Sequence, residues 1–270
     1  MVITNNDITQ KTYKKLSIQV SLSGLSFCVF DLISNKVINT MSIPFEKNKV
    51  IEEQLWRTFV DYPILTKSYD EVMVVHDNNL NAFVPTSLFD ANFLASYLQY
   101  NTKVFETDFF TYDVVFPYEM NNIYVPFVNI NNFLLDQYET FEYQNANSIL
   151  VKQLLDLSKN KEEKQVFVHV QKEHFELIVV KNQQLILFNS FQYKTPEDFI
   201  YYILFTCEQL QLNPETILVQ ILGNCSEDDA CFKIAFQYIR NCSLLDVTSK
   251  ASILDVTPTA LRNHFILYHS

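Results

Sequence analysis

Three acidic side chains, Asp31, Glu53 and Asp77, have the chemistry that metal-assisted hydrolysis requires. Clustered carboxylates hold pairs of divalent metal ions, which stabilise the attacking and leaving oxygens of a phosphodiester. Such a site also needs an aspartate in its first strand, and the first predicted strand, residues 16–20, has none. The formal net charge of −11 further opposes a nucleic acid substrate, because binding to phosphates depends on lysine and arginine. Hydrolysis of this kind is therefore the least favoured hypothesis.

The remaining candidates for a nucleophile or a metal site are also weak. Cys225 comes just before a predicted helix, where the pKa of a thiol can fall, but Glu227–Asp229 oppose a thiolate there, so we expect an unreactive cysteine. Ser226 with Asp229 three residues later predicts a capping box at the start of that helix, with an acidic cation site as the alternative. His169 and His174 have opposite strand parity, so we predict no metal site.

Glycine is rare in this chain. Gly24 and Gly223 are the two glycines, where an average usage of ~7% would give roughly 19. Backbone approaches a phosphate closely only where no Cβ intervenes. A Walker A loop needs two glycines about five residues apart, and the dinucleotide-binding G-x-G-x-x-G motif needs three. Both motifs are excluded.

The overall composition indicates a globular protein. Its 270 residues suffice for about two domains of ~150 residues each, and 48% of them are hydrophobic. With 20 basic against 31 acidic residues, neither nucleic acid nor an anionic membrane is an expected partner. No apolar run reaches the roughly 18 residues of a membrane span, and residues 1–15 do not resemble a signal peptide. The five cysteines lack C-x-x-C spacing, which is typical of reduced thiols, so we expect a cytoplasmic location.

An internal repeat organises these residues. Three strands joined by tight turns, then a helix, then a fourth strand occur twice, at an offset of about 150 residues. The predicted elements of the first copy are strands 16–20, 25–31 and 36–45, helix 49–61 and strand 71–77; those of the second are strands 166–170, 175–181 and 184–193, helix 196–210 and strand 216–222. Thr195, Pro196 and Asp198 mark the start of the second helix. We predict a right-handed crossover in each copy and two mixed sheets with helices on their faces.

The predicted organisation has three parts: residues 1–77 form a first lobe, 78–164 an inserted subdomain with a linker, and 165–270 a second lobe. The insertion is rich in phenylalanine and tyrosine. Its expected elements are helix 87–99, strands 104–109, 113–118 and 123–127, and helix 147–157. The aromatic residues favour a small core, and a partner-binding face is the alternative.

This order of elements resembles the actin-like ATPase superfamily, which includes actin, sugar kinases and heat-shock chaperone ATPases. The segments LSIQVSLSGLSFCVFD and FVHVQKEHFELIVV are more narrowly similar to a Bacteroidota family of unknown function with that fold. The resemblance implies an α/β fold with mixed sheets: a duplicated, ribonuclease H-like and actin-like two-lobed fold with a small inserted α+β subdomain.

The resemblance also places candidate cofactor-binding positions in a cleft between the lobes. In working members each of two hairpins reads roughly D-x-G, where the aspartate organises Mg²⁺ and water and the glycine amide holds phosphate. A third motif, a glycine pair after a strand, cradles adenosine. The matching positions in this chain are Gln19 and His169 for aspartate, Ser21 and Gln171 for glycine, Gly24 in the first turn, and Gly223 and Asn224 for the glycine pair.

These substitutions predict a degenerate nucleotide site without catalytic residues. A neutral amide and an imidazole cannot replace two carboxylates around hydrated Mg²⁺, and side chains at the glycine positions crowd a triphosphate. We therefore expect a non-catalytic binding or scaffolding module whose partner is another protein. The alternative is a divergent ATP-binding protein, or a weak ATPase, that uses Mg-ATP in the cleft.

Overall fold

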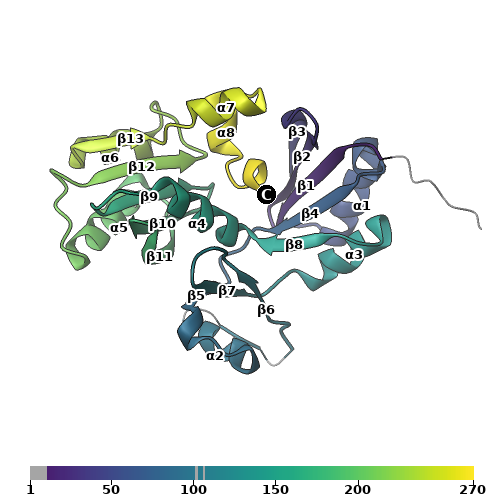
Figure 1. The fold of residues 1–270 in the computed structure, drawn as a ribbon, viewed down its shortest axis with the longest axis horizontal. Helices are drawn as coiled ribbons and strands as arrows, with labels where there is room; N and C mark the ends of the chain where they lie inside the picture. Colours follow the sequence, from purple (N-terminus) through teal and green to yellow (C-terminus); the bar gives the residue numbers. More distant parts are fainter. Residues whose placement is uncertain (1–10, 101–102, 106) are drawn as a thin grey trace, which may run out of the picture.

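Two five-stranded sheets form the two lobes of the molecule, and a three-stranded sheet lies below them in the view of Figure 1. The structure is a computed structural model that describes residues 11–100, 103–105 and 107–270. The first sheet has the order β3-β2-β1-β4-β8, with β1 Lys14–Ser21, β2 Gly24–Asp31, β3 Lys36–Pro44, β4 Glu71–His76 and β8 Glu142–Asn145. The second has the order β11-β10-β9-β12-β13, with β9 Gln165–Val170, β10 His174–Lys181, β11 Gln184–Gln192, β12 Leu218–Gly223 and β13 Asn241–Leu244.

The two sheets are built in the same way. Each begins with an antiparallel meander, and after a helix the next strand pairs in parallel with the first strand of the meander. This is the strand order that the sequence repeat predicts. The edge strands even share a bulge, because the pairing register skips Ile38 in β3 and Ile186 in β11. Asn182 and Gln183 both have positive φ, 42° and 64°, as expected for a two-residue hairpin turn.

Helices cover the outer faces of both sheets. Apolar side chains of α1 (Ile51–Asp61) and α3 (Val128–Tyr138) pack on the first sheet. Those of α5 (Pro196–Gln209) and α6 (Ala230–Tyr238) pack on the second. The predicted start of α5 is confirmed, since Thr195 and Asp198 form a capping box in which each side chain bonds the other residue's backbone. The capping box predicted at Ser226 is wrong: Ser226 and Asp229 bond each other in a turn, and α6 begins only at Ala230.

The inner faces of the two sheets share one apolar core. Helices α4 (Ala146–Leu157), α7 (Thr248–Leu254) and α8 (Pro258–Asn263), with the 3₁₀ turn Leu267–His269, contribute to it from between the lobes. Cys28 and Val75 enter this core from the first sheet, and Phe167 and Ile178 enter it from the second. The lobes therefore bury their inner apolar faces in common rather than separately.

The inserted segment forms the third sheet, of order β5-β7-β6, with β5 Asn81–Pro85, β6 Thr111–Val114 and β7 Met120–Tyr124. The helix predicted at 87–99 is shorter: 3₁₀ turns Thr86–Leu88 and Ala91–Phe93 precede α2 (Leu94–Leu98). A further 3₁₀ turn, Pro63–Thr66, follows α1. Of the predicted strand 104–109, the described residues are not in a strand. The range 78–164 also includes β8, which pairs with β4 in the first sheet, so the separate sheet spans less than the predicted insertion.

A buried polar network fastens this small sheet to the first lobe. The Asp113 carboxylate accepts hydrogen bonds from Tyr124 Oη (3.1 Å), the Asn145 backbone N–H (2.8 Å) and Ser148 Oγ (2.5 Å). Asn122 adds donations to Asn145 and Ser148. Burial raises the pKa of Asp113, although its three donors act in the opposite direction. Asn122 and Asn145 thus form buried hydrogen bonds, whereas Asn182 occupies a left-handed turn position.

The aromatic residues of the insertion divide between core and surface. Tyr124 is fully buried, whereas Phe105, Phe109, Tyr112 and Phe116 are exposed. The core interpretation therefore holds for only part of the set. No helix in the described ranges is both long and apolar enough to cross a membrane.

Candidate functional site

The first hairpin, β1–β2, and the second hairpin, β9–β10, both contact the carboxylate of Asp77. Asp77 directly follows β4, and its backbone N–H donates to Val20 O at 2.8 Å. Gln19 Nε2, at the aspartate position of the first hairpin, donates to Asp77 Oδ2 at 2.8 Å. Gln171 Nε2, at the glycine position of the second hairpin, donates to Asp77 Oδ1 at 3.2 Å. Two amides from opposite lobes thus share the two oxygens of one side chain.

A second contact between the lobes joins the loop after β3 to the β9–β10 turn. Lys47, in the loop after β3, forms an ion pair with Glu173 in the β9–β10 turn at 2.5 Å. The hydrogen bond from Lys47, helped by its charge, lowers the pKa of Glu173. Both side chains are exposed, so the ion pair adds little to stability. Together with Asp77, it places polar links across the expected cleft.

His169 does not face a free site but belongs to a buried cluster. Its Nδ1 lies 2.8 Å from Glu176 Oε2, and His174 Nε2 lies 3.0 Å from Glu176 Oε1. Burial would raise the pKa of Glu176, but the hydrogen bonds from the two imidazoles outweigh it and lower the pKa to about 2. For His174, burial lowers the pKa, and the hydrogen bond and charge of Glu176 raise it above its usual value. The cluster is a hydrogen-bonded group of two imidazoles around one buried carboxylate. The described residues contain no group of three His, Cys, Asp or Glu side chains placed to hold a metal.

Ser21 and Gly24 complete the first hairpin internally. Ser21 Oγ lies 3.0 Å from Ser23 Oγ and accepts the Ser23 backbone N–H at 3.2 Å. A Cβ on Gly24 would lie 2.7 Å from Ile43 O, so a glycine there lets β2 and β3 approach each other. Neither residue needs a ligand to explain it.

Gly223 and Asn224 end β12 against β9. Gly223 has a φ of +88°, and a Cβ on it would lie 2.3 Å from Val170 O. The next residue, Asn224, donates its backbone N–H to the same oxygen at 2.7 Å. The one glycine that remains of the glycine pair, Gly223, therefore has a structural explanation. Beyond it, burial raises the pKa of the Cys225 thiol to about 12, in keeping with an unreactive cysteine.

The matching of the hairpin motifs does not identify the two carboxylates that organise this region, Asp77 and Glu176. Glu176 could have been noticed as a charge within the apolar run 175–180, directly opposite His169 in the β9–β10 register. Asp77 is a candidate metal ligand by residue type, but its position in the sheet is what indicates a role in the site. It follows the carboxyl end of a strand parallel to β1, the edge at which α/β sheets form their crevices.

The link between the hairpins can be tested by a double-mutant cycle. We expect Asp77→Ala to lower the free energy of unfolding by about 1–2 kcal/mol, because two amides lose a charged acceptor. Gln171→Ala should cost less, and the double variant should cost less than the sum of the two. Urea denaturation of the three variants measures this. Strict additivity would show that the two side chains do not interact across the lobes.

The comparisons with known proteins agree with this architecture. A family model described as a protein of unknown function (DUF3822) matches residues 3–242. A crystal structure from Bacteroides thetaiotaomicron, described as a protein with actin-like ATPase fold and unknown function, is 21% identical with a TM-score of 0.80. The match covers 92% of this chain and 98% of that one. The PilM–PilN type IV pilus biogenesis complex contains a chain that is 10% identical with a TM-score of 0.55, over 94% of this chain and 96% of that one. No curated protein matches.

The chain therefore has the two-lobed α/β architecture of the actin-like ATPase fold. Because the family model spans most of its length, the chain belongs to the DUF3822 family of proteins of unknown function.

Proposed function

We propose that this protein is a non-catalytic binding module in which the nucleotide site of the actin-like fold has become a link between the lobes. The observation that carries the proposal is the shared Asp77 carboxylate, which accepts Gln19 from one lobe and Gln171 from the other. In a working site this region holds Mg²⁺ and phosphates. Here the Asp77 carboxylate accepts hydrogen bonds from the Gln19 and Gln171 amides. A triphosphate would therefore meet a negative charge in place of hydrogen-bond donors.

The rest of the cleft supports the same proposal. The aspartate positions carry Gln19 and His169, and the His169 ring is already paired with Glu176. Acidic residues 227–229 precede α6, so the start of that helix does not favour an anion. The remaining glycines fit close backbone packing rather than phosphate binding.

A protein partner is the occupant that these features favour. The net charge of −11 opposes nucleic acid and anionic membranes. A chain of similar fold has been solved within the PilM–PilN complex, so the architecture is compatible with assembly through protein contacts. That support is by analogy of fold alone. The five cysteines carry free thiols, which suits a cytoplasmic location.

A thermal-shift titration tests the loss of nucleotide binding. We expect no rise in melting temperature on adding about 5 mM Mg-ATP at constant ionic strength and constant free Mg²⁺. Binding with a dissociation constant of about 0.5 mM would add about 1.4 kcal/mol, which for a chain of this size is about 3–5 °C. Sodium sulfate at matched ionic strength is the control.

Asp77→Ala makes the titration sharper, since it removes the carboxylate that opposes the phosphates. A saturable ATP-dependent rise in the wild type, larger still in Asp77→Ala, would replace the proposal with its alternative, a divergent ATP-binding protein or weak ATPase. No rise in the wild type, whatever the variant does, supports a site that no longer serves nucleotides.

A further inference from the structure

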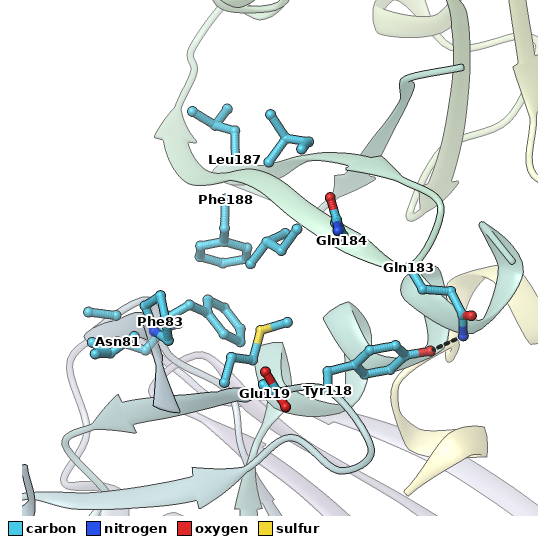
Figure 2. A pocket seen from close by; sticks show the side chains of 14 residues that line it. Asn81, Phe83, Tyr118, Glu119, Gln183, Gln184, Leu187 and Phe188 are labelled. Atoms are coloured by element: carbon cyan, nitrogen blue, oxygen red, sulfur yellow. Dashed lines mark hydrogen bonds between the residues drawn. The ribbon is translucent and has the colours of Figure 1, made fainter. Parts of the chain in front are cut away.

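A groove of about 670 Å³ runs between the inserted sheet and the second lobe. One wall is residues 81–85 of β5 with the segment 118–120, and the other is residues 183–188, the turn and first part of β11 (Figure 2). This volume is in the range of sites that bind small molecules or short peptides. It lies outside the cleft that contains Asp77.

Both walls are the edges of sheets. In the described part of the chain, β5 is a terminal strand of the three-stranded sheet and β11 is a terminal strand of the second five-stranded sheet. An edge strand presents backbone N–H and C=O groups that have no partner strand, and such edges are templates for pairing with another chain. Here two edges face one space, and each offers a run of five or six consecutive residues to it.

The floor of the groove is apolar and one end is closed. The Phe83 and Phe188 rings meet edge to face with centroids 5.0 Å apart. Gln183 Nε2 donates to Tyr118 Oη at 3.1 Å, which joins the two walls at one end (Figure 2). The bulge at Ile186 leaves that side chain 39% exposed on the groove wall. A bulge re-aims a side chain, so Ile186 offers apolar surface where a strand edge would otherwise be flat.

The charge of the groove indicates the chemistry of its occupant. Glu119, an exposed residue just before β7, is the charged side chain among the lining residues, which include no lysine or arginine. The molecule as a whole carries a net charge of −11. Both the local and the overall charge favour a segment with basic residues. Opposite charges speed the association of the two molecules and help to fix the register in which the segment binds.

We propose that this groove binds an extended segment of a partner protein, with apolar residues at alternate positions and a lysine or arginine that meets Glu119. The segment lies along the edges of β5 and β11 and bonds their free backbone groups, while its apolar side chains contact Phe83, Phe188 and Ile186. This is recognition by strand addition, in which backbone bonds give affinity and alternate side chains give specificity. The inference rests on the proposed binding function and names its surface and the class of its partner.

A phage-displayed library of random nonapeptides, selected on the immobilised full chain, supplies the probe. We expect enriched peptides to alternate apolar residues and to contain lysine or arginine. Fluorescence polarisation with the synthesised peptides then compares Ile186→Lys with Ile38→Lys. These two isoleucines occupy the same bulge position in the edge strands of the two sheets, so the second is a matched control. Ile186→Lys should weaken binding at least tenfold, and Ile38→Lys should leave it unchanged.

The charge is tested separately. Glu119→Gln should weaken the same peptides several-fold and reduce the dependence of their affinity on salt, whereas Glu142→Gln, an exposed glutamate on β8, should do neither. The proposal is overturned if no peptide is enriched above the level found with an unrelated immobilised protein. It is also overturned if enriched peptides bind Ile186→Lys as well as wild type while circular dichroism shows that the variant is folded.

The same peptides separate this inference from the proposed function. Binding that persists in the presence of Mg-ATP, together with a positive ATP thermal shift, would retain the groove and reject the loss of nucleotide binding. No peptide binding and no ATP shift would reject the groove alone.

Discussion

Gly223→Ala is expected to lower the free energy of unfolding by about 4 kcal/mol, which is at the upper end of single-residue effects. Two costs combine at this position. A φ of +88° is unfavourable for any residue with a side chain. In addition, the new Cβ would lie 2.3 Å from Val170 O, a backbone atom that also accepts the Asn224 N–H, so β9 and β12 would have to separate. Chemical denaturation with circular dichroism measures the loss.

Gly24→Ala is the matched control for this variant. Its Cβ would lie 2.7 Å from Ile43 O, so the backbone must also shift there, but without the burden of a left-handed φ. We expect about half of the effect seen at Gly223, on the order of 2 kcal/mol. A Gly223→Ala protein within about 1 kcal/mol of wild type would contradict the close approach of β12 to β9. That result would restore a ligand-binding explanation for Gly223.

Glu176→Gln is expected to cost about 3 kcal/mol near pH 6, because a buried charge partner of two imidazoles is lost. The pH dependence identifies the cause. The folded pKa of Glu176 is about 2, below its ordinary 4.5, so its contribution is complete above pH 4.5 and is lost as pH falls towards 2. The folded pKa of His174 is raised above 6.5, so its contribution is complete below pH 6.5 and is lost as pH rises through the raised value. The cluster therefore stabilises most between pH 4.5 and 6.5.

The measurement is the free energy of unfolding from pH 3 to 8 for wild type, Glu176→Gln and Glu173→Gln. Glu173 lies in the same hairpin, and Lys47 lowers its pKa too, but both side chains of this pair are exposed, so its replacement should remove only a small part of the slope on the acid side. We expect the Glu176→Gln profile to be flatter on both sides of the window. A Glu176→Gln profile parallel to that of wild type would show that the pairing of Glu176 with His174 does not cause the pH dependence of stability.

Strands of the repeat could be predicted because their apolar residues and turns follow a simple pattern. The Asn182–Gln183 turn and the Thr195 cap are local signals, and local signals are read from the sequence directly. Strand β8 is short and polar, and it becomes a strand only because β4 offers it an edge. Its place depends on residues distant in the chain, so no window of sequence around residues 142–145 reveals it.

The candidate site divides in the same way. The matching of Gln19 and His169 to the hairpin positions could be made from the sequence, because it depends only on counting along two strands. That Asp77 bridges Gln19 and Gln171 could not, because Gln171 comes from another lobe and the distance of 3.2 Å is set by how the sheets pack. The pairing of His169 with Glu176 is intermediate in predictability. It follows from the register of the β9–β10 hairpin, but only after the residues of the turn have been identified.

The shared core between the two sheets determines how freely the lobes can move. A hinge opening would draw α4 and the C-terminal helices away from one sheet and expose side chains such as Leu150, Leu222 and Leu267, which are fully buried. Each such exposure costs about 1.5–3 kcal/mol, so a wide opening approaches the cost of unfolding a lobe. The shared core therefore opposes a hinge movement and makes the two lobes one cooperative unit. It follows that the proposed binding groove would be present without a closing movement of the lobes.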